Sequence, residues 1–337
     1  MNNATATTAP SARRGNGGYT LIELLIVVAI IAVIAMLAVN KYGDLGKRAR
    51  ANANIANLAR VASGIETYIA ACDTDNEKPV FDKLDSLTRF DNHASGSAGS
   101  RANLANVDSL LLYTNQVGNV GLSSTLFGST NPWTNNREML LGTYYLADSD
   151  VQVLRDDLGI IYTMAGTDGA MSRQGDDGAW AQGDISNPLK CSSVATSNYA
   201  GRAAAIVNPG ATSGRTPVGP DIYKAVGEDV AYSYAGKILV GGVECANNQE
   251  AFEKLMVGDG ILMAFGLGDN SALVGNNLAG FDSAPTSPAM DKKEYRHYIV
   301  LVRVKYTAGR NGTFTAKSAE YAGVMDPNGK VLSQLRQ

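Results

Sequence analysis

The sequence predicts an α+β fold in which one long N-terminal helix packs on a head that contains an antiparallel β-sheet and large loop-rich insertions. No proline lies between Pro10 and Pro79, and the apolar residues of this stretch recur at helical spacing. Residues 298–321 read as two strands with alternating apolar and polar side chains. Most of the 36 glycines follow residue 90, which indicates a head rich in loops.

The composition limits the class of protein. The 337 residues suffice for one large domain or two ordinary ones, and a chain that is 45% hydrophobic and 18% charged is not of the disordered type. The net charge of −3 gives no electrostatic footprint for nucleic acid, and basic residues of the head do not cluster with aromatic ones. We therefore predict no nucleic-acid partner.

A polar N-terminal segment is followed by a long apolar one. Residues 1–18 contain no apolar run, and the two arginines at positions 13 and 14 read as charges retained in the cytoplasm. The next segment, Tyr19–Val39, has a single charge, Glu23, and a helix of that length spans about 30 Å, the thickness of a bilayer core. We predict a transmembrane helix here. A cleaved signal peptide fits less well, because its apolar region is normally about 7–15 residues long.

The predicted helix continues beyond the apolar segment, from Tyr19 to Ala71. Its second part, residues 40–72, is amphipathic and should lay a narrow apolar stripe on the head. The stripe residues recur at spacings of three and four: Ile55, Leu58, Ala62, Ile65, Ile69 and Cys72. The chain then divides into residues 1–18, the helix 19–72 and an extracytoplasmic globular head, 73–337.

Several elements of the head can be predicted from local pattern. Alternation makes Tyr298–Tyr306 the clearest strand, and Asn311-Gly312 then connects it to Thr313–Tyr321 as an antiparallel hairpin. The other predictions are short helices over 80–90, 101–112 and 249–256, strands over 230–234 and 237–243, and a turn over 326–329.

The residues that open the apolar segment form a recognisable junction, Gly18-Tyr19-Thr20-Leu21-Ile22-Glu23-Leu24. This junction closely resembles the class III leader junction of type IV pilins and type II secretion pseudopilins: a glycine, a hydrophobic residue, Thr-Leu-Ile-Glu-Leu and a long aliphatic run. The resemblance implies a pilin-like fold and a prepilin peptidase that cuts between Gly18 and Tyr19 and methylates the new amino group of Tyr19. Tyr19 stands where the family commonly has Phe or Met. The prolines that kink many pilin helices are missing, and the head is large for the family.

Glu23 needs an explanation on physical grounds alone. A charged side chain inside a transmembrane helix costs roughly 2.5–3.5 kcal/mol on insertion scales, so such a residue usually has a partner. Cleavage after Gly18 would give Tyr19 a free ammonium, and we expect Glu23 of one subunit to pair with that ammonium of a neighbour during assembly. The family uses the residue in the same way. The alternative is a Glu near the interface that extends to the lipid headgroups.

The remaining candidate sites lie in the head. Of the three cysteines, we expect Cys191 and Cys245 to form a disulfide and Cys72 to stay buried on the helix stripe, although the other two pairings remain open. A loop rich in Gly and Asp could offer oxygen ligands to calcium, but it lacks EF-hand spacing and reads better as an ordinary solvated loop. Its acidic residues are Asp168, Asp176, Asp177 and Asp184. We predict no metal site.

No motif in the sequence points to catalysis or to a cofactor. There is no nucleophile-elbow serine, no zinc-protease helix, no phosphate loop and no dinucleotide fingerprint. The sequence therefore predicts a structural protein that is not an enzyme.

Three hypotheses for function follow. The first is a structural subunit of a type IV pilus that resides in the inner membrane and then in an extracellular filament, where the large head favours a surface role such as adhesion. Its partners would be further copies of itself, other pilins, the prepilin peptidase and a membrane assembly machinery. The second is a pseudopilin of a type II secretion system, in a periplasmic pseudopilus. The third is a monomeric signal-anchored surface receptor or enzyme with an uncut N-terminus.

Overall fold

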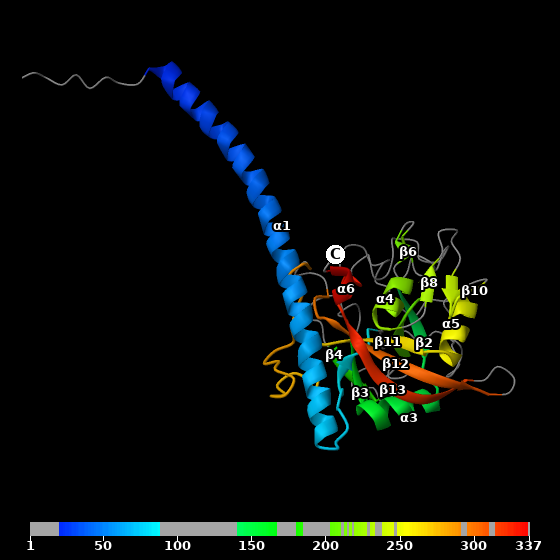
Figure 1. Ribbon diagram of the computed structural model, residues 1–337. Coiled ribbons are helices and arrows are strands. Elements are labelled where there is room, and N and C mark those ends of the chain that lie inside the picture. Colours follow the sequence, from blue (N-terminus) through cyan, green and yellow to red (C-terminus); the bar gives the residue numbers. More distant parts are fainter. Residues whose placement is uncertain are drawn as a thin grey trace, which may run out of the picture. The chain divides into compact units, whose positions relative to one another are not determined.

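The computed structural model describes residues 20–87, 140–166, 180–184, 203–209, 212–213, 216–217, 219–227, 230–232, 238–245, 248–290, 295–309 and 314–335. The chain forms two compact units, Met1–Ala49 and Arg50–Gln337. Helix α1, Leu21–Thr74, begins in the first unit and ends in the second (Figure 1). The predicted long helix is confirmed, and it ends three residues later than expected.

Within the second unit, α1 buries one stripe of residues, and this stripe is rotated slightly from the predicted one. The buried positions are Asn54, Leu58, Val61, Ile65, Tyr68 and Cys72. Leu58, Ile65 and Cys72 were predicted, whereas Ile55, Ala62 and Ile69 are only partly buried. The rotation has a physical reason: Asn54 and Tyr68 find hydrogen-bond partners inside the head. The Tyr68 hydroxyl, for example, accepts a hydrogen bond from the amide of Val80 at 2.9 Å.

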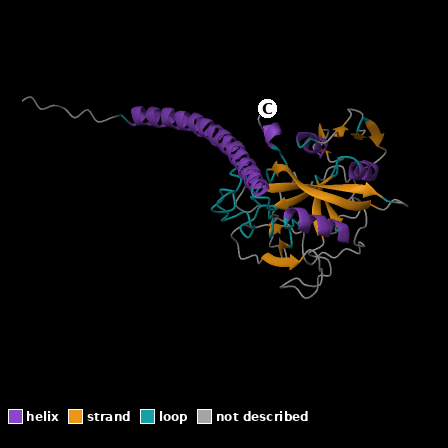
Figure 2. Ribbon diagram, turned by 60° about the horizontal axis from the view of Figure 1, so that its bottom comes forward, coloured by secondary structure: helices purple, strands orange, loops and turns teal. Residues whose placement is uncertain are grey.

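The centre of the second unit is an eight-stranded sheet among the described residues, with the strand order β13-β12-β11-β1-β3-β4 and with β5 and β2 branching from β11. Its pairs are antiparallel except for β1 with β3, so the sheet is mixed. Figure 2 shows these strands together, with helices beside them. The strands are β1 Leu84–Asp85, β2 Leu141–Tyr145, β3 Tyr162–Gly166, β4 Trp180–Asp184, β5 Ala203–Val207, β11 Ile261–Gly266, β12 Ile299–Ala308 and β13 Phe314–Met325.

The predicted C-terminal hairpin is confirmed as β12 and β13, and the predicted turn over 326–329 follows it. All six residues of β11 are buried, so this strand is covered on both faces. Two smaller sheets join β6 Thr212–Ser213 with β7 Thr216–Pro217, and β8 Val230–Tyr232 with β9 Ile238–Val240 and β10 Val243–Cys245. The helices after α1 are α3 Asp148–Leu158, α4 Gly219–Ala225, α5 Asn248–Val257 and α6 Leu332–Leu335.

Two local predictions are wrong and a third lies outside the described residues. Residues 80–87 form an extended segment that contains β1, and the positive φ angles of Lys83 (58°) and Leu87 (55°) exclude the predicted helix. The predicted single strand 237–243 is a hairpin of β9 and β10, turned by Gly241 and Gly242 at positive φ. The predicted helix 101–112 is not among the described residues. The predicted helix 249–256 is confirmed as α5.

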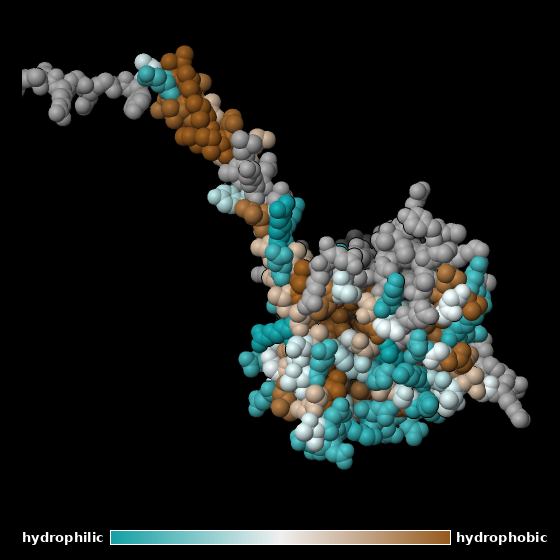
Figure 3. Space-filling view, viewed as in Figure 1, coloured by the Kyte–Doolittle hydropathy of each residue, from teal (hydrophilic) through white to brown (hydrophobic). Residues whose placement is uncertain are grey.

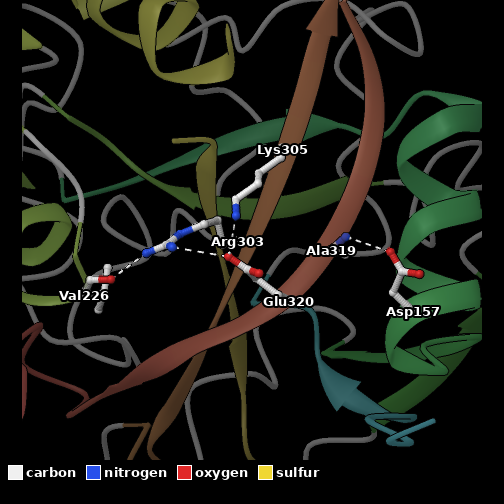
Figure 4. Close-up of polar contacts among 6 residues, drawn as sticks. All are labelled: Asp157, Val226, Arg303, Lys305, Ala319 and Glu320. Carbon is white, nitrogen blue, oxygen red and sulfur yellow. Dashed lines mark hydrogen bonds and ion pairs between the residues drawn. The ribbon is translucent and has the colours of Figure 1, made fainter. Parts of the chain in front are cut away.

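Helix α3 covers the outer edge of the sheet along β13. The Asp157 carboxylate accepts a hydrogen bond from the amide of Ala319 at 2.9 Å (Figure 4), and Ser149 Oγ accepts one from the amide of Ala316 at 3.1 Å. Unpaired edge amides are templates for another strand. Because α3 occupies two of them, this edge is poorly suited to strand addition.

A buried polar cluster connects α1 to the end of the sheet. Asn54 Nδ2 donates to Asp326 Oδ2 at 2.9 Å, while Asn54 Oδ1 accepts hydrogen bonds from Ser287 Oγ at 2.7 Å and from the Tyr298 hydroxyl at 2.9 Å. The second oxygen of Asp326 accepts two further bonds, from the amides of the turn that follows β13. One helix residue is therefore bonded to the start of β12, to the turn after β13 and to the loop between β11 and β12.

The segment of residues 267–290 lies against α1, where Figure 1 shows it in orange. Its backbone comes so close that a Cβ at Gly64 would lie 2.5 Å from the carbonyl oxygen of Ala279. Arg60 donates to the Gly280 carbonyl at 3.4 Å beside this contact. Only glycine fits at position 64 with this packing.

Candidate assembly site

The described part of the N-terminal site begins with a capped helix. Thr20 precedes α1, and its amide and hydroxyl donate hydrogen bonds to Glu23 Oε2 at 2.8 and 2.9 Å. In return, Thr20 Oγ1 accepts a hydrogen bond from the Glu23 amide at 3.3 Å. This reciprocal arrangement is a capping box, which satisfies free amides at the start of a helix. The Glu23 carboxylate is thus held at the N-terminal end of α1, where the helix dipole favours a negative charge.

After Glu23, the helix surface is aliphatic on all sides. Figure 3 shows in brown the face of this stretch that is in view. Twelve large apolar side chains between Leu21 and Met36 are exposed, with exposed fractions from 83% at Leu21 to 49% at Val27. Soluble monomers rarely expose contiguous apolar patches of this kind, and such a patch marks a surface that contacts lipid or other protein. A helix that is apolar all round needs such surroundings on every side.

The other predicted site residues are placed as follows. Gly18, Tyr19, Cys191, Asp168, Asp176 and Asp177 lie outside the described residues. Cys72 is buried on the helix stripe, as predicted. Cys245 is buried, and burial raises the pKa of its thiol, which makes it a weaker nucleophile. Since its expected partner is not described, the Cys191–Cys245 disulfide stays a prediction. Where the structure describes the chain, no group of three or more His, Cys, Asp or Glu residues is arranged to hold a metal ion.

Sequence reasoning missed the role of Thr20, although the signal was present. Thr20-Leu21-Ile22-Glu23 has the Thr-x-x-Glu spacing of a capping box directly before an apolar run. The prediction for Glu23 considered a partner in another subunit, with the lipid headgroups as the alternative. The structure adds a partner within the same subunit, so Glu23 has two separable interactions to test.

The predicted transmembrane segment is described only in part, because Tyr19 and the side chains of residues 37–41 are not included. In the portion of the chain that is described, no helix has both the length and the apolar character needed to cross a membrane.

Comparison with known proteins identifies the N-terminal segment. Residues 13–39 match the model of the prokaryotic N-terminal methylation motif. This range contains the predicted cleavage point at Gly18, the predicted methylation point at Tyr19, and the capping residues Thr20 and Glu23. No match was found among the curated proteins or among the solved structures. This motif is the class III prepilin leader, so the N-terminal segment is similar to that of type IV pilins and pseudopilins.

Proposed function

We propose that this chain is a structural subunit of a type IV pilus. The observation that carries the proposal is the helix that follows the methylation motif: it is aliphatic on all sides over residues 21–36 and has one carboxylate, Glu23, at its start. The head, which continues for about 265 residues after Cys72, favours a surface-exposed pilus over a periplasmic pseudopilus. The proposal assigns the protein a mechanical role and no catalytic one.

In the proposed mechanism, the prepilin peptidase removes the leader after Gly18 while the apolar segment is held in the inner membrane. The segment then leaves the lipid and packs among the same segments of other subunits, so its apolar surface stays away from water throughout. Glu23 pairs with the ammonium of a neighbouring Tyr19 in this low-dielectric core, where a charge-assisted hydrogen bond is stronger than at a surface. The heads form the outside of the filament.

The first experiment examines processing and polymer together. Filaments sheared from cells are purified, and the subunit is analysed by intact mass and N-terminal sequencing. We expect a chain that begins at methylated Tyr19 and has 319 residues, 18 fewer than the full 337. A head found only in cell-bound monomers with the leader retained would refute the proposal and favour the signal-anchored hypothesis. Cleaved subunits found only in a periplasmic polymer would favour the pseudopilin.

The second experiment separates the two interactions of Glu23. Glu23→Gln removes the charge but keeps an oxygen that can accept the Thr20 hydrogen bonds, whereas Thr20→Ala removes the capping hydroxyl and leaves the charge. Breaking a buried charge pair by removing one partner typically costs about 3–5 kcal/mol, compared with about 1 kcal/mol for a lost cap. We therefore expect Glu23→Gln and Glu23→Ala to be cleaved but to enter filaments poorly. Thr20→Ala should assemble, and Glu23→Asp should be intermediate.

The opposite result would limit Glu23 to a role within its own helix. If Glu23→Gln filaments formed in wild-type amount while Thr20→Ala and Glu23→Ala filaments did not, Glu23 would act only as a helix cap. The intersubunit charge pair would then be wrong, and the case for a pilin would depend on the leader and the apolar surface.

A further inference from the structure

A groove on the head has an acidic lining that nothing in the proposed mechanism uses so far. It has a volume of about 410 Å³ and lies among the last turns of α1, the end of α3 and strand β13. Ile69 and Leu158 give it apolar lining. Its charged lining consists of Glu66, Asp73, Asp157 and Glu320, and none of the described residues that line it is basic. We call it the acidic groove.

Two of the four carboxylates are already engaged, and two are not. Glu320 forms ion pairs with Arg303 at 3.2 Å and with Lys305 at 3.0 Å, and Asp157 accepts the amide hydrogen bond of the β13 edge (Figure 4). Glu66 and Asp73 are exposed, and neither forms an ion pair with any residue in the described part of the chain. The groove therefore retains negative charge that no described residue of the head neutralises through an ion pair.

The position of Asp73 increases this negative potential. It lies in the last turn of α1, where the helix dipole is negative and where the helix has no basic residue. An acidic side chain is unfavourable at such a helix end, and a cation is favourable. Both the side chains and the helix end thus select a positively charged partner.

A matching segment exists on the same helix in every copy of the chain. Lys47, Arg48 and Arg50 are exposed on α1. Arg50 precedes Glu66 by 16 residues and Asp73 by 23, which corresponds to about 24 and 35 Å along a helix. Since no side chain spans such a distance, this basic segment cannot reach the groove of its own chain.

We propose that the acidic groove binds the basic segment Lys47–Arg50 of a second copy of this chain. The inference depends on the proposed function, because it needs α1 helices of neighbouring subunits to run parallel within a filament. Counted over the whole segment, the charges then pair when the two copies are offset along the axis by about 24–39 Å. Glu66 and Asp73 receive the cationic groups, while Ile69 and Leu158 contact the methylene stems of the lysine and arginine side chains.

Charge reversal with a compensating partner tests the contact. The groove variant carries Glu66→Lys and Asp73→Lys, the segment variant carries Lys47→Glu and Arg48→Glu, and a third variant combines all four. Juxtaposed like charges are strongly unfavourable at an interface, so we expect each double variant to lower the yield of sheared filaments at least about tenfold. The combined variant should recover most of the yield. Asp282→Lys makes the same change at an exposed position outside the groove and should assemble normally.

The melting temperature shows whether a variant loses filament yield because its head unfolds. Asp73→Lys places a cation at the C-terminal end of a helix, which favours the fold, so the groove variant should have a melting temperature no lower than that of the wild type. A second measurement uses wild-type filaments treated with a carbodiimide, which joins amines to carboxylates in direct contact. We expect mass spectrometry to find Lys47 joined to Glu66 or Asp73, and the helix distance makes any such link intermolecular.

The outcomes distinguish this inference from the function beneath it. If wild-type filaments form but the groove variant assembles normally, or if the combined variant fails to recover, the contact is wrong and the pilus proposal stands. If mature wild-type chains form no polymer, the proposed function fails and the contact with it.

Discussion

Asn54 offers a direct test of how α1 is fixed to the head. Its amide makes three buried side-chain hydrogen bonds, to Asp326, Ser287 and Tyr298, at 2.7–2.9 Å. Asn54→Ala would leave buried polar groups without these partners, and each such group costs about 1–3 kcal/mol. A net loss of about 3 kcal/mol is therefore expected. For a domain of this size, that corresponds to a melting temperature lowered by about 6–12 °C.

The assay is thermal unfolding of the full-length protein in detergent, with Asn52→Ala as the matched control. Asn52 is on the exposed side of the same helix, two residues away, so its replacement should change stability by less than about 0.5 kcal/mol. Asn54→Asp should also be destabilising at neutral pH, because it places a second carboxylate beside Asp326, whose pKa burial already raises. If Asn54→Ala unfolded at the same temperature as Asn52→Ala, the buried cluster would contribute nothing and the reasoning would be wrong.

Two further predictions concern packing and pH. Gly64→Ala should destabilise the head by about 1–3 kcal/mol in thermal unfolding, because its Cβ meets the Ala279 carbonyl, whereas Gly46→Ala, with open space around it, should not. Burial raises the pKa of Asp85 to about 8, so the folded state holds a proton that the unfolded state releases. The contribution of Asp85 to stability should therefore fall as pH rises from about 4 to 8. Asp85→Asn should remove this loss. Burial lowers the pKa of His297 to about 4, so stability should also fall as pH decreases from about 6.5 to 4. Urea unfolding across pH 4–8 checks both. The two effects oppose each other from about pH 4 to 6.5, so the wild type should lose stability mainly from about pH 6.5 to 8, and Asp85→Asn should show the His297 effect alone below pH 6.5. A wild type whose stability does not change between pH 6.5 and 8, or an Asp85→Asn variant with no change below pH 6.5, would contradict them.

The sequence predicts those parts of the fold whose causes are local. The long helix follows from the absence of proline and the apolar spacing, and β12 follows from strict alternation over Tyr298–Tyr306. The hairpin follows from the Asn-Gly pair after it. The capping box at Thr20 belongs to the same group, because four adjacent residues specify it completely.

What could not be predicted depends on contacts between distant residues. Strand β11 is a continuous apolar run, Ile261–Gly266, which periodicity alone cannot distinguish from a buried helix segment. Strand β1 has two residues and exists because its neighbours pair with it. The helix stripe was misplaced at Asn54 because counting apolar residues ignores a polar residue whose partners lie more than 200 positions away. The acidic groove likewise combines residues from three separate elements.

Apolar and charged residues of α1 contribute to the proposed assembly in different ways. The twelve exposed side chains between Leu21 and Met36 represent about 10–20 kcal/mol of hydrophobic burial, as much as the whole stability of a typical domain. That energy can drive assembly, but it is non-directional, and a uniformly aliphatic helix can slide along its neighbours with little change in buried area.

The axial position of one subunit relative to the next must therefore be set by charged residues, which pair only when their partner is close. Glu23 is the only charge between Leu21 and Met36, and the basic segment and the acidic groove provide charged positions further along α1. If both contacts form, the Glu23 pair positions the N-terminal ends of neighbouring helices, and the groove contact positions the heads. A change of charge at either end should then alter the register or the yield of the filament, while the affinity of the aliphatic core remains.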